Sequence, residues 1–356
     1  MALLFTPLTI RGLTVRNRAW VSPMCQYSAR EGRPGEWHLV HLGSFAKGGA
    51  GLVMVEATGV LPEGRITPAC TGIWTDEQAA DFERIVAFLH SQGATAGIQL
   101  AHAGRKASSQ IPWLGRGTVP PEEGGWQTLA PSALAFDGLA EPLAMTLPQI
   151  DAVVAAWAAA AHRARRAGFD VVEIHAAHGY LLHEFLSPLS NIRTDEYGGS
   201  LENRARLLLR VAAAVRGAWP DDRPVFARVS ATDWVAGGWD IEQTVQVARW
   251  LAEAGIDLVD TSSGGLSPAQ RIPVGPGYQV PLAARIRAEA DVLTSAVGLI
   301  LTGEQAERVL QDGAADAVMM GRPMLRDPAW AQHAALDLGV EPPWPTQYHR
   351  VAELPH

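Results

Sequence analysis

The chain has 356 residues, of which 47% are hydrophobic and 19% charged, and this composition excludes a disordered chain, a collagen-like repeat and a small disulfide scaffold. Lys and Arg number 29 against 37 Asp and Glu, a net charge of -8 with no basic block, which argues against nucleic-acid binding. Two cysteines, Cys25 and Cys70, are too few for a secreted disulfide framework, the first residues lack the basic start of a signal peptide, and no apolar run approaches the roughly 20 residues of a membrane span. We therefore expect a cytoplasmic protein of enzyme size that binds neither membrane nor nucleic acid.

Short runs rich in Val and Ile alternate with longer segments of helical spacing along the chain. The predicted strands are 18–22, 52–57, 96–101, 171–175, 225–229, 258–262, 292–296 and 317–320. The predicted helices are 76–91, 149–167, 201–219, 242–254, 282–290 and 303–311, with 36–47 as a weaker first helix. Apolar strands that alternate with helices indicate a parallel sheet, so we expect one (β/α)8 TIM barrel over residues 1–356. An open doubly wound sheet is the alternative, although no G-x-G-x-x-G motif follows an early strand.

Two segments do not follow this alternation. Residues 104–147 come after the third strand and are rich in Pro and Gly without a core pattern, so we expect a capping insertion over the barrel mouth rather than a second domain. The C-terminal segment 342–356 carries Trp344, Tyr348 and Arg350 on what we expect to be a proline-restricted, non-helical track. Because Trp, Tyr and Arg anchor protein interfaces, we expect this tail at a subunit interface; packing on its own barrel is the alternative.

Polar residues and glycines mark the ends of the predicted strands, where a TIM barrel carries its chemistry. His175 and His178 are three residues apart and are followed by Tyr180, so two imidazoles could offer N–H donors to one anionic or carbonyl group. The same pair is half of a zinc site, for which His102 or Glu173 could supply a third ligand. A metal-dependent barrel hydrolase is therefore an alternative to substrate binding without a metal.

Three further places in the sequence carry candidate functional residues. Arg228 lies in a strand of Val, Phe and Ala, where a buried cation needs either an anionic ligand or a carboxylate on a neighbouring strand. Gly298, Gly321 and Arg322 follow the last two strands, where many barrels bind a phosphate group. Cys25 is either a nucleophilic thiol or a small buried residue.

Five stretches of the sequence are distinctive: SPMCQYSA (22–29), GLVMVEATGVLPEGRIT (51–67), GIQLAHAGRKA (97–107), DVVEIHAAHGYLLHEFLSPLSNIRTDEYGGSLENRARLL (170–208) and GRPMLRDP (321–328). They resemble the Old Yellow Enzyme family, in particular its thermophilic-like branch of bacterial NADPH dehydrogenases and xenobiotic reductases. The likeness covers essentially the whole chain. It implies a TIM barrel that holds non-covalent FMN at its mouth. It also implies an ene-reductase, in which NADPH reduces the flavin and the flavin reduces the activated C=C bond of an enone, an enal or a related electrophilic alkene.

The resemblance implies roles for individual residues. Contacts with FMN are implied for Ser22, Pro23, Met24, Cys25, Ala57, Gln99, Arg228, Gly298, Gly321 and Arg322. Cys25 would also tune the redox potential of the flavin. His175 and His178 would bind the carbonyl oxygen of the substrate, Tyr180 would protonate its α-carbon, and Tyr27 would help to hold it. Because pure binding needs no proton donor, Tyr180 argues against a non-catalytic flavin-binding or redox-sensing protein.

The resemblance also bears on assembly and on the substrate entrance. It implies a homodimer or homotetramer in which Arg350 reaches the neighbouring active site. Lys106 aligns with a lysine near the edge of the flavin. Residues 109–127 are longer and richer in Pro, Gly and Trp than in compact members, which leaves the shape of the entrance open.

Overall fold

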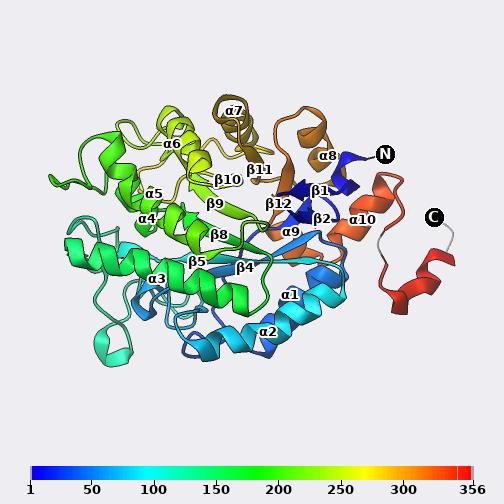
Figure 1. The fold of residues 1–356 in the computed structure, drawn as a ribbon, viewed down its shortest axis with the longest axis horizontal. Helices are drawn as coiled ribbons and strands as arrows, with labels where there is room; N and C mark the ends of the chain where they lie inside the picture. The colour runs from blue at the N-terminus through cyan, green and yellow to red at the C-terminus, as the bar shows by residue number, and fades with distance from the viewer. Residues whose placement is uncertain (1, 343, 354–356) are drawn as a thin grey trace.

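Eight parallel strands close into a barrel in the computed structural model of this chain, which describes residues 2–342 and 344–353 (Figure 1). In barrel order the strands are β3 (Ala19–Val21), β4 (Leu52–Gly59), β5 (Thr95–Ala101), β8 (Val171–Ala176), β9 (Val225–Ser230), β10 (Leu258–Ser262), β11 (Leu293–Ala296) and β12 (Ala317–Met320). β12 pairs with β3, which closes the ring. The predicted TIM barrel is confirmed, and the open doubly wound sheet is wrong.

Helices surround the barrel. The outer ring consists of α1 (Glu36–Lys47), α2 (Asp76–Ser91), α3 (Leu147–Arg166), α5 (Leu201–Ala218), α6 (Ile241–Glu253), α7 (Val280–Ala290), α8 (Gly303–Gln311), α9 (Arg322–Arg326) and α10 (Trp330–Asp337). Side-chain N-caps begin five of these helices, α2, α3, α5, α6 and α8. At α3 the Thr146 hydroxyl accepts the backbone N–H of Gln149, and the Gln149 side chain accepts the Thr146 N–H. This cap begins α3 two residues before the predicted start. Within the described residues, no helix is long and apolar enough to cross a membrane.

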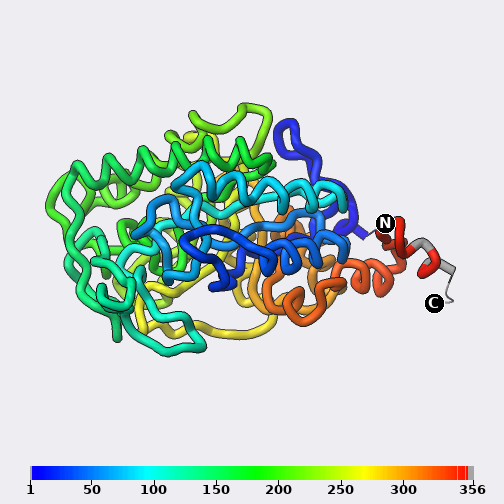
Figure 2. The backbone as a smooth tube through the Cα atoms, turned by 90° about the horizontal axis from the view of Figure 1, so that it is seen from below, coloured from blue at the N-terminus to red at the C-terminus, as the bar shows by residue number. Residues whose placement is uncertain are grey.

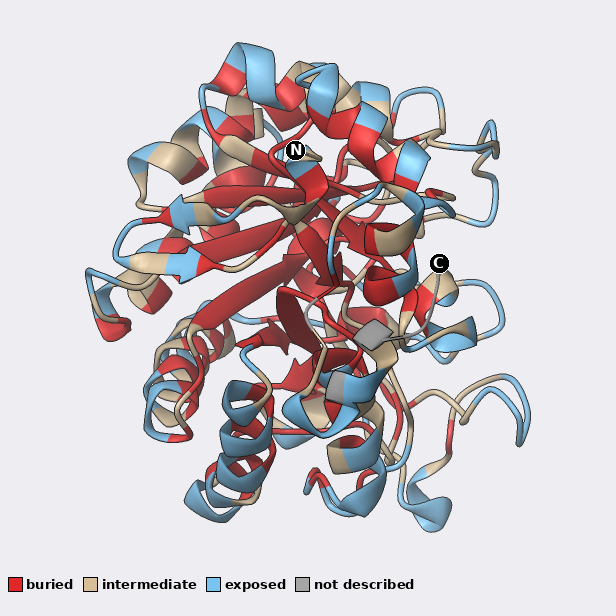
Figure 3. Ribbon diagram, turned by 90° about the vertical axis from the view of Figure 1, so that its right-hand side faces the viewer, coloured by how far each residue is buried: buried red, intermediate tan, exposed pale blue. Residues whose placement is uncertain are grey.

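Apolar side chains fill the space between the barrel and the helices, and also the barrel interior at the N-terminal ends of the strands, the lower part of the barrel. Figure 3 shows that the barrel strands are buried and that the outer faces of the helices are exposed. The lower interior contains Trp20 and Phe226, whose rings stack at 5.8 Å. A hairpin that the sequence pattern did not predict, β1 (Leu8–Ile10) with β2 (Leu13–Val15), packs its Ile10 and Val15 against this layer. The N-terminal end of the barrel is therefore sealed, which leaves the C-terminal ends of the strands for a site.

The excursion after β5 has little regular structure. It contains the helical turns η3 (Gly104–Lys106) and η4 (Pro121–Glu123) and the short parallel pair β6 (Leu129–Ala130) and β7 (Leu143–Ala144). Figure 2 shows this excursion at the opposite end of the molecule from the two chain termini. Three remaining elements are the turns η1 (Leu3–Phe5) and η2 (Pro62–Gly64) and the short helix α4 (Leu181–Leu186) directly after β8.

The expectation of a non-helical C-terminal tail is wrong. Thr346–Glu353 forms the 3-10 segment η5, with a kink at Tyr348. Three of the tail's four prolines, at positions 342, 343 and 345, precede this segment, and the fourth, at position 355, follows it. The Tyr348 N–H donates to the Pro345 carbonyl at the start of the turn. Of the predicted tail 342–356, residues 343 and 354–356 lie outside the described residues.

Candidate active site

Strand register places polar side chains in one layer at the upper end of the barrel. His175 on β8 is paired with Arg228 on β9, Arg228 with Asp260 on β10, and Asp260 with Ser295 on β11. All four residues are buried. Interior positions of parallel strands recur every two residues, so these side chains share the barrel interior just above the apolar layer.

Three aromatic rings predicted to act together do lie together. The His175 ring centroid is 5.2 Å from that of His178 and 5.1 Å from that of Tyr180, and both contacts are edge-to-face. His178 has a positive φ of 60°, which a non-glycine residue rarely adopts. The Ser230 hydroxyl accepts the His178 backbone N–H, and the His178 Nε2 atom is 2.7 Å from the Ser262 hydroxyl, so β9 and β10 hold this turn in place.

Burial keeps these rings uncharged. It lowers the pKa of His175 and of His178 well below the ordinary value, and the positive charge of Arg228 acts in the same direction. The His175 Nδ1 atom accepts the Ala177 N–H at 3.3 Å, which leaves the proton on Nε2 as a donor. Burial also raises the pKa of Tyr180 well above its usual value, so its hydroxyl retains the proton. The site thus presents neutral donors rather than charges.

A buried charge cluster underlies the rings. Arg228 Nε lies 3.1 Å from Asp260 Oδ2, and Arg228 Nη1 donates to the Ser22 hydroxyl at 3.0 Å. Of the two partners that the sequence left open for Arg228, the structure thus contains the carboxylate on a neighbouring strand. Glu173 accepts a hydrogen bond from Gln99 Nε2 at 2.8 Å, while its Oε2 atom is buried without a hydrogen bond. Burial, with the negative charge of Asp260, raises the pKa of Glu173 to about 8.

The two cysteines of the chain lie close together on two loops, Cys25 after β3 and Cys70 after β4. Cys25 is half-buried and Cys70 is fully buried. The neighbouring Cys70 thiol and burial raise the pKa of Cys25, so the thiol stays protonated. Glu56 holds the loop that carries Cys25, because its carboxylate accepts the backbone N–H of Gln26 at 3.1 Å. The same carboxylate lies 3.2 Å from His38 on α1. A protonated Cys25 is a poor nucleophile, which disfavours the nucleophile interpretation.

Two glycines and one exposed arginine follow the C-terminal ends of β11 and β12. Gly298 has φ of +123°, and a Cβ atom there would lie 2.8 Å from Gln279 Nε2. A Cβ atom on Gly321 would lie 3.3 Å from the sulfur of Met24. Arg322 directly follows Gly321 and is exposed. Both glycines are half-buried and Arg322 adds a positive charge, which agrees with the phosphate site that the sequence predicts.

The third ligand that the metal alternative requires is not beside the histidine pair. His102 accepts the Gly104 N–H on Nδ1 and stacks on Trp157 of α3, and Glu173 belongs to the charge cluster. Across residues 2–342 and 344–353, no group of three or more His, Cys, Asp or Glu side chains has a geometry suited to a metal ion.

Several buried polar residues were not predicted from the sequence as part of the site. Asp260 pairs with Arg228, and His183 on α4 lies 2.9 Å from Asp233 while its Nδ1 atom accepts the Gly179 N–H. The His183 pair therefore orients the turn that carries His178 and Tyr180. An Asp inside the apolar run Leu258–Ser262 was a signal for Asp260, whereas the partner of His183 lies 50 residues away and gave none.

The excursion after β5 contacts the same turn. Lys106 donates to the carbonyl oxygen of His178 at 2.9 Å and to that of Gly265. Its ammonium lies 4.1 Å from the Phe136 ring centroid and 5.6 Å from that of Tyr180. The edge of Trp113, on the long loop 109–127, packs on Tyr27 at 5.7 Å between ring centroids. Arg350 is exposed on η5, and the described chain brings it to none of these residues.

Several known proteins are similar to this chain. The NADH:flavin oxidoreductase / NADH oxidase family matches residues 3–340. An NADPH dehydrogenase of Bacillus subtilis (strain 168) is 49% identical over 350 residues, which cover 98% of each chain. The structure of morphinone reductase in complex with tetrahydroNAD is 30% identical, with a TM-score of 0.79 over 97% of this chain and 93% of that one. A 2-naphthoyl-CoA reductase complex is 26% identical with a TM-score of 0.85, and the chain spans about half of its length, 52%.

Proposed function

This chain is an NADPH dehydrogenase of the NADH:flavin oxidoreductase / NADH oxidase family, the family of Old Yellow Enzyme, and we propose that it is an ene-reductase with non-covalent FMN. Its acceptors are small alkenes activated by a carbonyl or similar group. When bound, FMN supplies the hydride chemistry between NADPH and the alkene. The charge cluster, the histidine pair and Tyr180 support this proposal in turn.

The residues at the barrel mouth fit FMN. Arg228 uses Nε and Nη1 within the described protein but has no partner there for Nη2, so it retains a donor for a ring that gains negative charge on reduction. Gln99 Nε2 is committed to Glu173, which leaves its carbonyl oxygen for an N–H edge. The glycine backbone at Gly298 and Gly321, both half-buried, and the exposed Arg322 suit a phosphate. Ser22, Pro23, Met24, Cys25 and Ala57 would then line the ring.

The histidine pair activates the alkene. In the neutral state His175 keeps a hydrogen on Nε2. His178 offers a hydrogen on Nδ1 when the Ser262 hydroxyl donates to its Nε2 atom rather than to Gln279 Oε1. Two N–H donors on one carbonyl oxygen stabilise the enolate charge that develops as the β-carbon accepts hydride. Because both rings are fixed before the substrate arrives, they need little reorganisation.

Tyr180 completes the reduction as the proton donor. Its hydroxyl is protonated at neutral pH and its ring stands against His175, so one side chain can hold a proton beside the carbon next to the carbonyl. Tyr27, whose ring is restrained by Trp113, would hold the substrate from the other loop. Cys25 would contact the flavin as a thiol and tune its potential.

The observation that carries the proposal is the convergence of His175, His178 and Tyr180 over the Arg228–Asp260 pair. Anaerobic titration tests it: the purified protein should be yellow, should bleach with NADPH and should recover its colour with cyclohexenone. In Tyr180→Phe, NADPH should still bleach the flavin, but the colour should return with cyclohexenone about 10²–10⁴-fold more slowly. A protein that binds FMN and bleaches but ignores every enone would be a flavin-binding redox sensor, and a colourless protein that rejects FMN would refute the cofactor.

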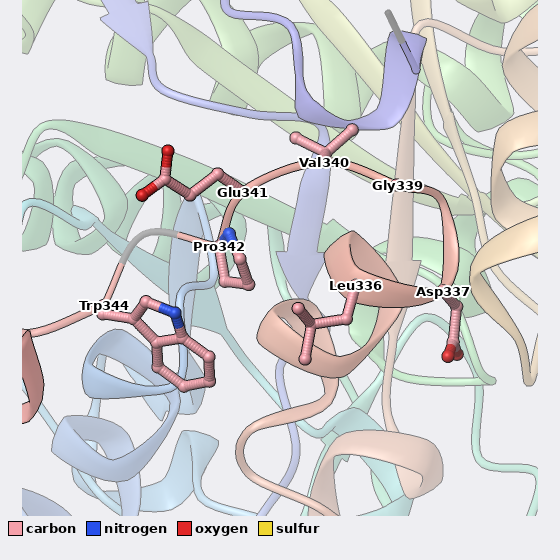
Figure 4. A pocket seen from close by; sticks show the side chains of 7 residues that line it. All are labelled: Leu336, Asp337, Gly339, Val340, Glu341, Pro342 and Trp344. Carbon is pink, nitrogen blue, oxygen red and sulfur yellow. The ribbon is translucent and has the colours of Figure 1, made fainter. Parts of the chain in front are cut away.

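We also propose a homodimer or homotetramer in which Arg350 enters the neighbouring active site. The tail lies beside α1, where Lys47 Nζ is 3.2 Å from the Tyr348 hydroxyl. Between α10 and the tail is a cavity of about 660 Å³, lined by Leu336, Val340, Pro342 and Trp344 among others (Figure 4). This face, which also carries Asp337 and Glu341 beside its apolar side chains, suits a second copy. Truncation after Pro343 should change both sedimentation and the KM for cyclohexenone; if neither changes, the shared site is wrong.

A further inference from the structure

A second cavity, of about 430 Å³, lies beside the proposed proton donor. Tyr180 and Lys106 form part of its wall, and most of the remaining wall comes from the excursion after β5, including Arg116, Phe136 and Asp137. This volume is within the range of small-ligand sites. A molecule whose reacting end lies at Tyr180 would therefore place its other end against the excursion.

The two cations of this wall differ in their partners. Lys106 is committed, because it donates to two backbone carbonyl groups and is nearly buried. Arg116 is exposed and makes no hydrogen bond or ion pair with any residue of the described chain. Asp137 lines the same cavity without pairing with Arg116. An unpaired guanidinium in a cavity wall offers a planar, two-pronged donor to a phosphate or carboxylate.

The loop that carries Arg116 is tied on both sides. Gln110 donates its N–H to the Gly117 carbonyl, Ser109 is bridged to Thr118, and the Thr118 hydroxyl accepts the Ala140 N–H at 2.7 Å. Trp113, near the tip, packs on Tyr27. Arg116 is thus held between the loop base and a side chain of the proposed substrate site, which reduces the entropy lost when a ligand binds.

We propose that Arg116 binds an anionic group of the ligand that reacts at Tyr180, and so makes this cavity a specificity site. The proposal rests on the proposed function of that site. The anionic group has two sources with the same chemistry: a phosphate of NADPH during flavin reduction, or a carboxylate on the alkene during its reduction. Arg116 acts on binding, not on the bonds that change, so it favours charged ligands over neutral ones.

Two matched ligand pairs separate the sources in the holoenzyme. Flavin reduction is followed anaerobically with NADPH and with NADH, and alkene reduction with 4-carboxycinnamaldehyde and with its methyl ester. Arg116→Ala should lower the ratio of kcat/KM within one pair by about 5–10-fold where only one member carries the bound group, the loss of one exposed charge-assisted hydrogen bond. Where the bound group is the pyrophosphate, kcat/KM should fall equally for both nucleotides. Arg116→Lys should recover part of that ratio, and added salt should bring the wild-type ratio toward that of the alanine variant.

Each outcome assigns or removes the site. A fall in the NADPH-to-NADH ratio identifies the 2′-phosphate, and an equal loss for both nucleotides identifies their shared pyrophosphate. A fall in the acid-to-ester ratio identifies the substrate carboxylate. The control is Arg165→Ala, an exposed arginine in the last turn of α3, which should change none of these values. If Arg116→Ala matches this control in all four reactions, the proposal is overturned. If the wild type bleaches with NADPH but reduces neither aldehyde, the ene-reductase proposal fails, and the nucleotide pair still tests Arg116.

Discussion

The lower and upper layers of the barrel interior are built by the same strands, two residues apart, yet they differ completely in chemistry. The lower layer contains Trp20, Val171, Phe226 and Leu258. Two residues further along the same strands are Ser22, Glu173, Arg228 and Asp260. All eight side chains are buried. One strand can therefore supply a stable foundation and a reactive surface, because its interior positions recur every two residues.

The difference lies in what each layer needs from its surroundings. Apolar side chains gain free energy from burial with any well-packed neighbour. Charged groups lose hydration on burial and must be compensated by one another or by a ligand. Glu173 Oε2, buried without a hydrogen bond, shows that this compensation is incomplete within the protein alone. We therefore expect substitutions in the lower layer to affect stability alone, and substitutions in the upper layer to affect both stability and cofactor binding.

Arg228→Met should have the largest effect. It leaves Asp260 charged and unpaired in the interior, which should cost about 3–5 kcal/mol of folding free energy and abolish FMN retention. Denaturant unfolding measures the first effect, and the flavin absorbance of the purified protein measures the second.

A double variant separates the two losses. Arg228→Met with Asp260→Leu removes both charges, so much of the stability should return while FMN binding does not. If the double variant binds FMN as the wild type does, Arg228 is not a cofactor residue and serves the fold only.

Phe226→Ala, in the lower layer, should cost about 3–5 kcal/mol of folding free energy through the cavity it creates against Trp20. It should not reduce FMN binding. The variant should bind FMN and reduce cyclohexenone at nearly the wild-type rate at a temperature where it is folded. A large drop in FMN affinity without a change in the unfolding midpoint would erase the distinction between the layers.

The two layers differ in how much of each can be predicted from the sequence. The alternation of apolar strands and helices predicted all eight barrel strands, because burial on both faces leaves a local signal. The ends of the strands, with His175, His178 and Tyr180, were also readable from local motifs. The pairing of Arg228 with Asp260, and of Glu56 with His38, depends on closure of the barrel and on loop packing, which no local pattern records. Likewise the hairpin β1–β2 is too short for a clear period.

His178→Ala should have an intermediate effect, confined to the upper layer. Two N–H donors at one point favour a phenolate oxygen, so we expect phenols to bind there, and losing one strong hydrogen bond should weaken their binding by about 1.5–3 kcal/mol. Titration of the flavin spectrum with a phenol measures this. Flavin reduction by NADPH should suffer less than enone reduction, and unchanged phenol affinity would contradict the role of His178 in oxygen binding.

The effect of Glu173→Gln should be a change in how stability depends on pH. In the folded protein the pKa of Glu173 is raised from 4.5 to about 8, because the carboxyl group is buried and lies near Asp260, with Arg228 and Gln99 acting in the opposite direction. Between these two values the folded state keeps a proton that the unfolded state has released, so the stability of the wild type falls as pH rises from about 5 to about 8. The glutamine variant carries no such proton. The wild type should therefore lose up to about 1.4 kcal/mol per pH unit relative to Glu173→Gln across this range, measured by denaturant unfolding at several pH values. Parallel pH profiles for the two proteins would mean that Glu173 is ionised in the folded state and that Arg228 compensates both carboxylates of the upper layer.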